Sequence, residues 1–86
     1  MDPFREEMQR IFPKVEKILT EKRMSEFVQT PESDLKKYHS GLGTMIRLKL
    51  LRPKSVLYKM FIQSGIYDRD MMVRTIIWAF HKSVQP

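Results

Sequence analysis

The clearest helical pattern in this 86-residue chain is DRDMMVRTIIWAFHKSV, residues 68–84. Its apolar side chains recur at three- and four-residue intervals, which places them on one face of an α-helix. The inward positions are Met72, Val73, Ile76, Ile77, Phe80 and Val84. Asp68 precedes the pattern, and its side chain can accept hydrogen bonds from the free backbone N–H groups of a helix start. The segment therefore predicts a capped helix from Asp68 to about Val84 with one buried face.

Two further helices are predicted upstream. Ser55 is the expected N-cap of a short helix through Ser64, and Gly65 is suited to end it because glycine readily adopts a left-handed conformation. Its inward residues are expected to be Val56, Leu57, Met60 and Phe61. An earlier helix is predicted to start at Thr30, with Pro31 in its first position, and to reach about Leu50.

Two glycines, Gly41 and Gly43, lie inside that earlier helix. A glycine in a helix interior costs about 0.5–1 kcal/mol relative to alanine. Two so close together indicate either that another backbone packs against this point or that the helix is distorted there. A nucleotide-binding loop is not predicted, because the third glycine of that pattern is replaced by Ile46 and no strand precedes it.

The N-terminal segment is also predicted to be helical. Asp2 and Pro3 suit its N-cap and first position, and an apolar stripe follows. The stripe consists of Phe4, Met8, Ile11, Phe12, Val15, Ile18 and Leu19. Pro13 removes a backbone donor, and we expect it to kink the helix without ending it. The prediction is an all-α domain over residues 1–86, a bundle or orthogonal array of about four helices. It divides into an amphipathic N-terminal segment, 1–29, and a basic helical core, 30–86.

Basic charge is concentrated in the middle of the chain. The net charge is +6; residues 35–67 hold seven basic and no acidic side chains, whereas residues 1–34 hold six basic and eight acidic ones. A stretch of one sign attracts anionic partners. The predicted partner-binding residues are Lys36, Lys37, Arg47, Lys49, Arg52, Lys54 and Lys59.

The residues needed for catalysis do not form a recognisable motif. The chain has no cysteine, which rules out disulfides, thiolate metal sites and a cysteine nucleophile. Its two histidines, His39 and His81, are too few for a histidine-rich metal site, and Asp68 and Asp70 are explained by helix capping. We therefore expect no enzyme activity, metal or cofactor. No apolar run approaches the roughly 20 residues of a spanning helix, and we expect a cytoplasmic protein.

The segment from Tyr38 to Arg47, YHSGLGTMIR, resembles a functionally uncharacterised family of short bacterial and phage helical proteins. Members of that family carry a His-x-Gly-Leu-Gly-x-x-Ile-Arg signature. The downstream matches are Ser55, Leu57, Phe61, Gly65, Ile66, Asp70, Met72, Ile76, Ile77, Phe80 and His81. The similarity covers about residues 35–82. It implies an all-helical fold and no known activity, and by analogy it suggests an inhibitor or regulator of a host protein.

Within that signature, Tyr38, His39 and Arg47 are a candidate anion- or ligand-binding cluster. His39 and Arg47 are about two helical turns apart in the predicted helix, so they project from nearly the same side. The structural alternative is that His39 bonds a neighbouring helix end and Arg47 pairs with Asp68 or Asp70. Trp78 has two interpretations as well, the edge of the core or an exposed interface anchor.

The predicted function is a non-catalytic helical module that binds and regulates an acidic protein partner. The alternative is a nucleic-acid-binding protein that uses the basic 36–59 surface. A helix-turn-helix over residues 55–82 is disfavoured, because Asp68 and Asp70 would face phosphates at the start of its recognition helix. The sequence leaves the oligomeric state open.

Overall fold

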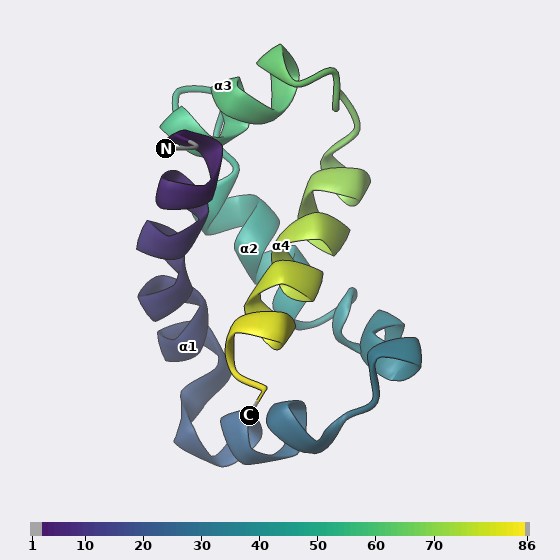
Figure 1. Cartoon of the computed structure of the whole chain (residues 1–86). Helices are drawn as coiled ribbons and strands as arrows, with labels where there is room; N and C mark the ends of the chain where they lie inside the picture. Colours follow the sequence, from purple (N-terminus) through teal and green to yellow (C-terminus); the bar gives the residue numbers. More distant parts are fainter. Residues whose placement is uncertain (1–2, 86) are drawn as a thin grey trace.

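Helices follow one another along residues 3–85, the part of the chain that the computed structural model describes (Figure 1). They are α1 (Pro3–Gln29), the 3-10 helix η1 (Glu32–Tyr38), α2 (Leu42–Leu50), α3 (Val56–Gln63) and α4 (Arg69–Ser83). No strand occurs among the described residues, and the predicted all-α single domain is confirmed. The expected N-cap Asp2 lies outside the described range.

The first helix keeps the predicted apolar stripe but breaks at a different residue. Met8, Ile11, Val15 and Leu19 are buried. Pro13 stays inside α1, and the one residue of this helix with non-helical backbone angles is Thr20, at φ 69° and ψ 160°. The prediction of a kink at Pro13 therefore misplaced the break. Pro13 and Gln9 are both exposed, so water can bond the Gln9 carbonyl that the proline leaves without a donor.

The break at Thr20 turns the end of α1 across the bottom of the fold (Figure 1). Phe27, which follows the turn, is fully buried and is surrounded by rings. Its ring centroid lies 4.9 Å from that of Tyr38, 5.5 Å from Phe80 and 5.3 Å from His81. The end of α1 therefore joins η1 and the end of α4 in one core.

The predicted helix from Thr30 to Leu50 is two elements. Pro31 is the N-cap of η1, and residues 39–41 turn the chain before α2 begins at Leu42. Thr30 does not cap η1; its hydroxyl donates to the Glu26 carbonyl at 2.8 Å and lies 3.2 Å from the Tyr38 hydroxyl. The distortion expected from Gly41 and Gly43 is thus present as a complete break.

The capping residues in the sequence predicted the last two helices, α3 and α4, correctly. The Ser55 side chain accepts a hydrogen bond from the Tyr58 N–H at 3.1 Å, and the Asp68 carboxylate accepts one from the Asp70 N–H at 2.9 Å. Gly65 has the expected left-handed conformation, with φ 89°. The inward placement of Val56 is wrong: this first-turn side chain is 56% exposed, whereas Leu57 and Phe61 are buried.

The helices pack around α4, which runs down the front of the fold with α1 beside it and α2 behind it (Figure 1). α1 contacts α2, α3 and α4, so the N-terminal helix docks on its own core. Gly43 allows α2 to approach α4 closely, because a Cβ atom there would lie 3.0 Å from Val73 Cγ1. This approach sets the spacing of the side chains that form the candidate site.

Candidate functional site

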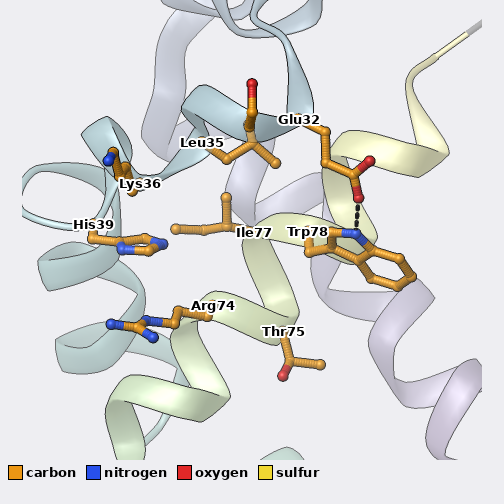
Figure 2. Close-up of a pocket in the computed structure, with 9 residues that line it drawn as sticks. Glu32, Leu35, Lys36, His39, Arg74, Thr75, Ile77 and Trp78 are labelled. Carbon is orange, nitrogen blue, oxygen red and sulfur yellow. Dashed lines mark hydrogen bonds between the residues drawn. The ribbon is translucent and has the colours of Figure 1, made fainter.

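An open hollow of about 520 Å³ lies between η1 and α4 (Figure 2). Leu35 and Ile77 are buried beneath it and give it an apolar floor. Trp78 and Glu32 stand on one side, and Lys36, His39 and Arg74 stand on the opposite side (Figure 2). The hollow therefore combines an apolar floor with a cationic wall, an arrangement suited to a ligand that is both apolar and acidic.

Trp78 lies outside the core, with 45% of its surface exposed. Its indole N–H donates a hydrogen bond to the Glu32 carboxylate, which ties α4 to the start of η1 (Figure 2). The Lys82 ammonium lies 4.7 Å from the centroid of the Trp78 ring system. Trp78 also lines a second hollow of about 720 Å³ between α1 and α4, so its ring forms a ridge between two depressions.

The cationic wall contains charges that the protein leaves without partners. Within residues 3–85, Lys36 and Arg74 form no ion pair and no side-chain hydrogen bond. His39, between them, is half-buried, and its pKa is lowered from 6.5, first by burial and then by the Arg74 guanidinium, with Asp70 acting in the opposite direction. The lowered pKa favours the neutral form of His39 near pH 7, so the fixed positive charge of this wall comes from Lys36 and Arg74.

A smaller cavity of about 190 Å³ adjoins the hollow and shares His39 and Arg74 with it. Arg47 reaches this cavity from α2, and its Nη1 atom lies 3.6 Å from Oδ1 of Asp70 on α4. Gly43 lines the cavity where α2 begins. Two arginines from different helices and one histidine therefore surround one small space.

The structure brings together part of the predicted ligand cluster. His39 and Arg47 line the same cavity, but Tyr38 is buried and its hydroxyl faces Thr30, so it is excluded from the cluster. Arg47 makes the predicted structural pairing with Asp70. His39 makes no side-chain hydrogen bond in the described part of the chain, so it does not bond a helix end.

Sequence reasoning missed Arg74, which lines both the hollow and the small cavity. A signal was present: Asp70, Arg74 and Trp78 are spaced at intervals of four residues, so they lie on one face of α4. Charge counting overlooked it because Arg74 lies beyond the strongly basic middle of the chain.

The seven predicted basic residues are all exposed, but they lie on different elements. Lys36 and Lys37 are on η1 and Lys59 is on α3, at opposite ends of the fold (Figure 1). Lys37 pairs with Glu26 at 3.4 Å, and Arg52 donates to the Leu48 carbonyl at 3.3 Å. The remaining members are Arg47 and Lys49 on α2 and Lys54 in the loop before α3.

Lys49 lies at a second basic feature, a groove of about 330 Å³ between α1 and α2. Lys14 and Lys17 of α1 line the same groove, together with Ile18 and Leu50. The N-terminal helix thus adds positive charge beside α2.

His81 belongs to the packed interior and not to the candidate site. It is buried, and its Nε2 atom lies 2.8 Å from the Thr30 carbonyl oxygen, a contact that connects α4 to the segment before η1. Among residues 3–85, no group of three or more histidine, aspartate or glutamate side chains is placed to hold a metal ion. Nor does any helix in that range have the length and apolar character needed to cross a membrane.

A family model described as "Domain of unknown function (DUF6794)" matches residues 6–84. The chain belongs to this family. The DUF6794 match begins in α1 and ends just after α4, so it includes the N-terminal helix that the motif resemblance over residues 35–82 left out. Searches of curated proteins and of solved structures found no match.

Proposed function

We propose that this DUF6794 chain is a non-catalytic helical module that binds an acidic segment of a partner protein in the hollow between η1 and α4. The observation that carries the proposal is the position of Trp78 opposite two cations without partners, Lys36 and Arg74, across an apolar floor. An acidic side chain of the partner would pair with the cations while a neighbouring apolar side chain covers Leu35 and Ile77.

The energetics of protein interfaces support this choice of site. Tryptophan and arginine are over-represented among the residues that contribute most binding energy, and Trp78 and Arg74 are one helical turn apart. The Glu32 contact holds the indole in place before binding, which lowers the side-chain entropy lost on association. The net charge of +6 would steer an acidic partner toward the molecule.

We further propose that binding regulates the partner, in the manner of a small phage-type inhibitor, and that it takes place in the cytoplasm. A chain without cysteine needs no oxidising compartment to fold. A module of this kind acts by occupying a surface, so it requires no reacting groups. The best candidate for such groups, His39 with Arg74, has one carboxylate beside it, that of Asp70, and no carboxylate pair.

The test is a selection from a displayed library of random peptides at physiological salt. Wild-type protein is the target, and Lys36→Glu/Arg74→Glu protein is the counter-target that removes peptides bound elsewhere. Because both substituted side chains are exposed, the variant should keep its fold, which circular dichroism checks. We expect peptides that combine aspartate or glutamate with an aromatic or aliphatic residue.

The matched control is Lys54→Glu/Lys59→Glu, which makes the same charge change at exposed positions away from the hollow. Selected peptides should bind this control as tightly as wild type. A selection that yields no acidic enrichment, or peptides that bind both double variants equally, would show that the hollow is not the binding site.

A nucleic-acid-binding function is the second candidate, and the groove with Lys14, Lys17 and Lys49 favours it. Lysines aligned along a groove contact phosphates without reading sequence, so affinity would fall steeply with salt. Labelled duplex DNA, single-stranded DNA and RNA would be titrated at low and physiological salt. Binding that persists at physiological salt and is lost in Lys49→Glu/Arg52→Glu, but not in Lys36→Glu/Arg74→Glu, would establish this alternative. Loss of all binding at physiological salt would reject it.

A further inference from the structure

We propose that the small cavity between α2 and α4 is a binding site for the phosphoryl group of a phosphate monoester. The cavity adjoins the peptide-binding hollow, but the proposal does not depend on the proposed function. It rests on the arrangement of Arg47, Arg74 and His39 around one space of about 190 Å³.

The two arginines supply the recognition chemistry. A guanidinium group presents paired N–H donors that match two oxygens of a phosphoryl group, and arginine is favoured over lysine where such recognition matters. Arg47 comes from α2 and Arg74 from α4, so they can approach a ligand from two directions. Arg74 has no ion-pair partner among the described residues, and it is therefore available to a ligand.

The contact between Arg47 and Asp70 does not close the site. The N···O distance is 3.6 Å, and the two side chains are 50% and 71% exposed. An exposed pair of this kind contributes little to stability, so Arg47 can turn toward a doubly charged phosphoryl group at little cost. Asp70 repels an anion, but the two arginines outnumber it and leave the cavity positive.

The backbone of α2 adds to this environment. Gly43 and Thr44, in the first turn of α2, both line the cavity. N–H groups of a first turn have no acceptor within their own helix and favour anions nearby. A Cβ atom at position 43 would press on Val73, 3.0 Å away, and would be in ordinary contact with the backbone oxygen of Tyr38 at 3.5 Å. Glycine therefore lets the start of α2 lie close to His39 and α4.

His39 provides a readout specific to the site. Its surroundings are Arg74 and Asp70 on α4, Arg47 on α2 and Lys36 on η1. A phosphoryl group would add negative charge beside the ring and counteract the effect of Arg74, so ligand binding should raise the His39 pKa. The protonated ring would then donate a hydrogen bond to the ligand, and binding would take up protons.

The experiment is an NMR titration of the histidine ring signals with inorganic phosphate and with N-acetyl-phosphoserine amide, at constant ionic strength set by sodium chloride. The chain has only two histidines, and His81 is buried against Thr30 away from the cavity, so it serves as an internal control. We expect saturable shifts of the His39 signal and a higher His39 pKa in the presence of ligand, with no such change at His81.

Variants test the assignment of the two arginines. Arg74→Gln should weaken binding tenfold or more, Arg47→Gln should weaken it several-fold, and Lys59→Gln should leave it unchanged. Folding is checked by the His81 signal, which should not move in any of them. Equal binding by wild type and Arg74→Gln, or His39 shifts no larger than sodium chloride alone produces, would overturn the proposal.

The two ligands separate the two sources of a phosphoryl group. Tighter binding of the phosphoserine derivative assigns the site to a phosphorylated side chain of a protein, and equal binding assigns it to a free phosphate or small phosphate ester. Either result supports the site. Failure here leaves the peptide selection unaffected, because unphosphorylated peptides test the larger hollow alone.

Discussion

Thr20 holds a backbone conformation that glycine adopts far more readily. Its angles, φ 69° and ψ 160°, lie in a region that is essentially restricted to glycine, and other residues there carry a strain of about 1–3 kcal/mol. We predict that Thr20→Gly stabilises the protein, with a rise of roughly 1 kcal/mol in the free energy of unfolding. Urea denaturation followed by circular dichroism measures the change.

The control for this substitution is Ser25→Gly, at an exposed position with regular helical conformation in α1. There glycine should destabilise by about 0.5 kcal/mol, because it is a poorer helix former than serine and adds backbone freedom to the unfolded chain. If Thr20→Gly destabilises the protein as Ser25→Gly does, then α1 has no left-handed break at Thr20 in solution.

His39 should make stability depend on pH. Burial and the Arg74 guanidinium lower its pKa from 6.5, so the unfolded chain takes up this proton at a higher pH than the folded chain does. Stability rises with pH wherever the unfolded state binds more protons. The contribution of His39 is therefore complete above its unfolded pKa of 6.5 and is lost as the pH falls from there through the lowered pKa of the folded state.

The measurement is urea denaturation of wild type and His39→Gln between about pH 5 and 8, a range around the ordinary histidine pKa. Wild type should lose more stability on acidification than the variant, and the two curves should run parallel above neutrality. Parallel curves over the whole range would contradict the lowered pKa.

At the level of elements, the contact between α2 and α4 depends on Gly43. We predict that Gly43→Ala destabilises the protein by about 1 kcal/mol. Overpacking the core costs about 1–3 kcal/mol. Replacing a glycine in a helix by alanine offsets about 0.5–1 kcal/mol of this, because alanine loses less backbone freedom on folding. The new methyl group would lie 3.0 Å from Val73 Cγ1, and a buried valine on a helix has little rotational freedom. Thermal denaturation measures the loss.

Gly41→Ala is the matched control, because position 41 is exposed and a Cβ atom there comes no closer than 3.6 Å to Arg23 Nη2. It should be neutral or slightly stabilising. The double variant Gly43→Ala/Val73→Ala should show less than the sum of its single effects, because Val73→Ala removes the clash. Additive effects would mean that the two helices are not in contact at this point.

Helix ends that are determined by residues next to them in the sequence could be predicted. Helix breaks that depend on contacts with distant segments could not. Ser55 and Asp68 cap their helices with their own side chains, and Gly65 ends α3 by its own conformational preference. The break between η1 and α2 depends instead on packing against α1 and α4. Thr20 gave no signal at all, since threonine is among the residues least expected at a positive φ.

In the whole molecule, the candidate site exists because α4 lies between α1, α2 and η1. Trp78 bonds Glu32, and His39 faces Arg74, across long sequence separations that no helical periodicity links. The sequence predicted His39 and Arg47 as one cluster, Lys36 as part of the basic surface and Trp78 on its own, and the fold brings all four to one region between η1, α2 and α4. Arg74 joins the hollow to the small cavity, and its four-residue spacing from Asp70 and Trp78 was the sequence signal that the charge count passed over.

The most direct test of the central claim is the affinity of Arg74→Glu for an acidic peptide selected on wild type. Trp78 is the only tryptophan in the chain, and its fluorescence reports binding in the hollow itself. Placing a carboxylate on the cationic wall should weaken binding at least tenfold, or about 1.4 kcal/mol. Lys59→Glu should bind within a factor of two of wild type. Equal affinity for wild type and Arg74→Glu, or equal weakening in both variants, would contradict the assignment of the hollow as the partner-binding site.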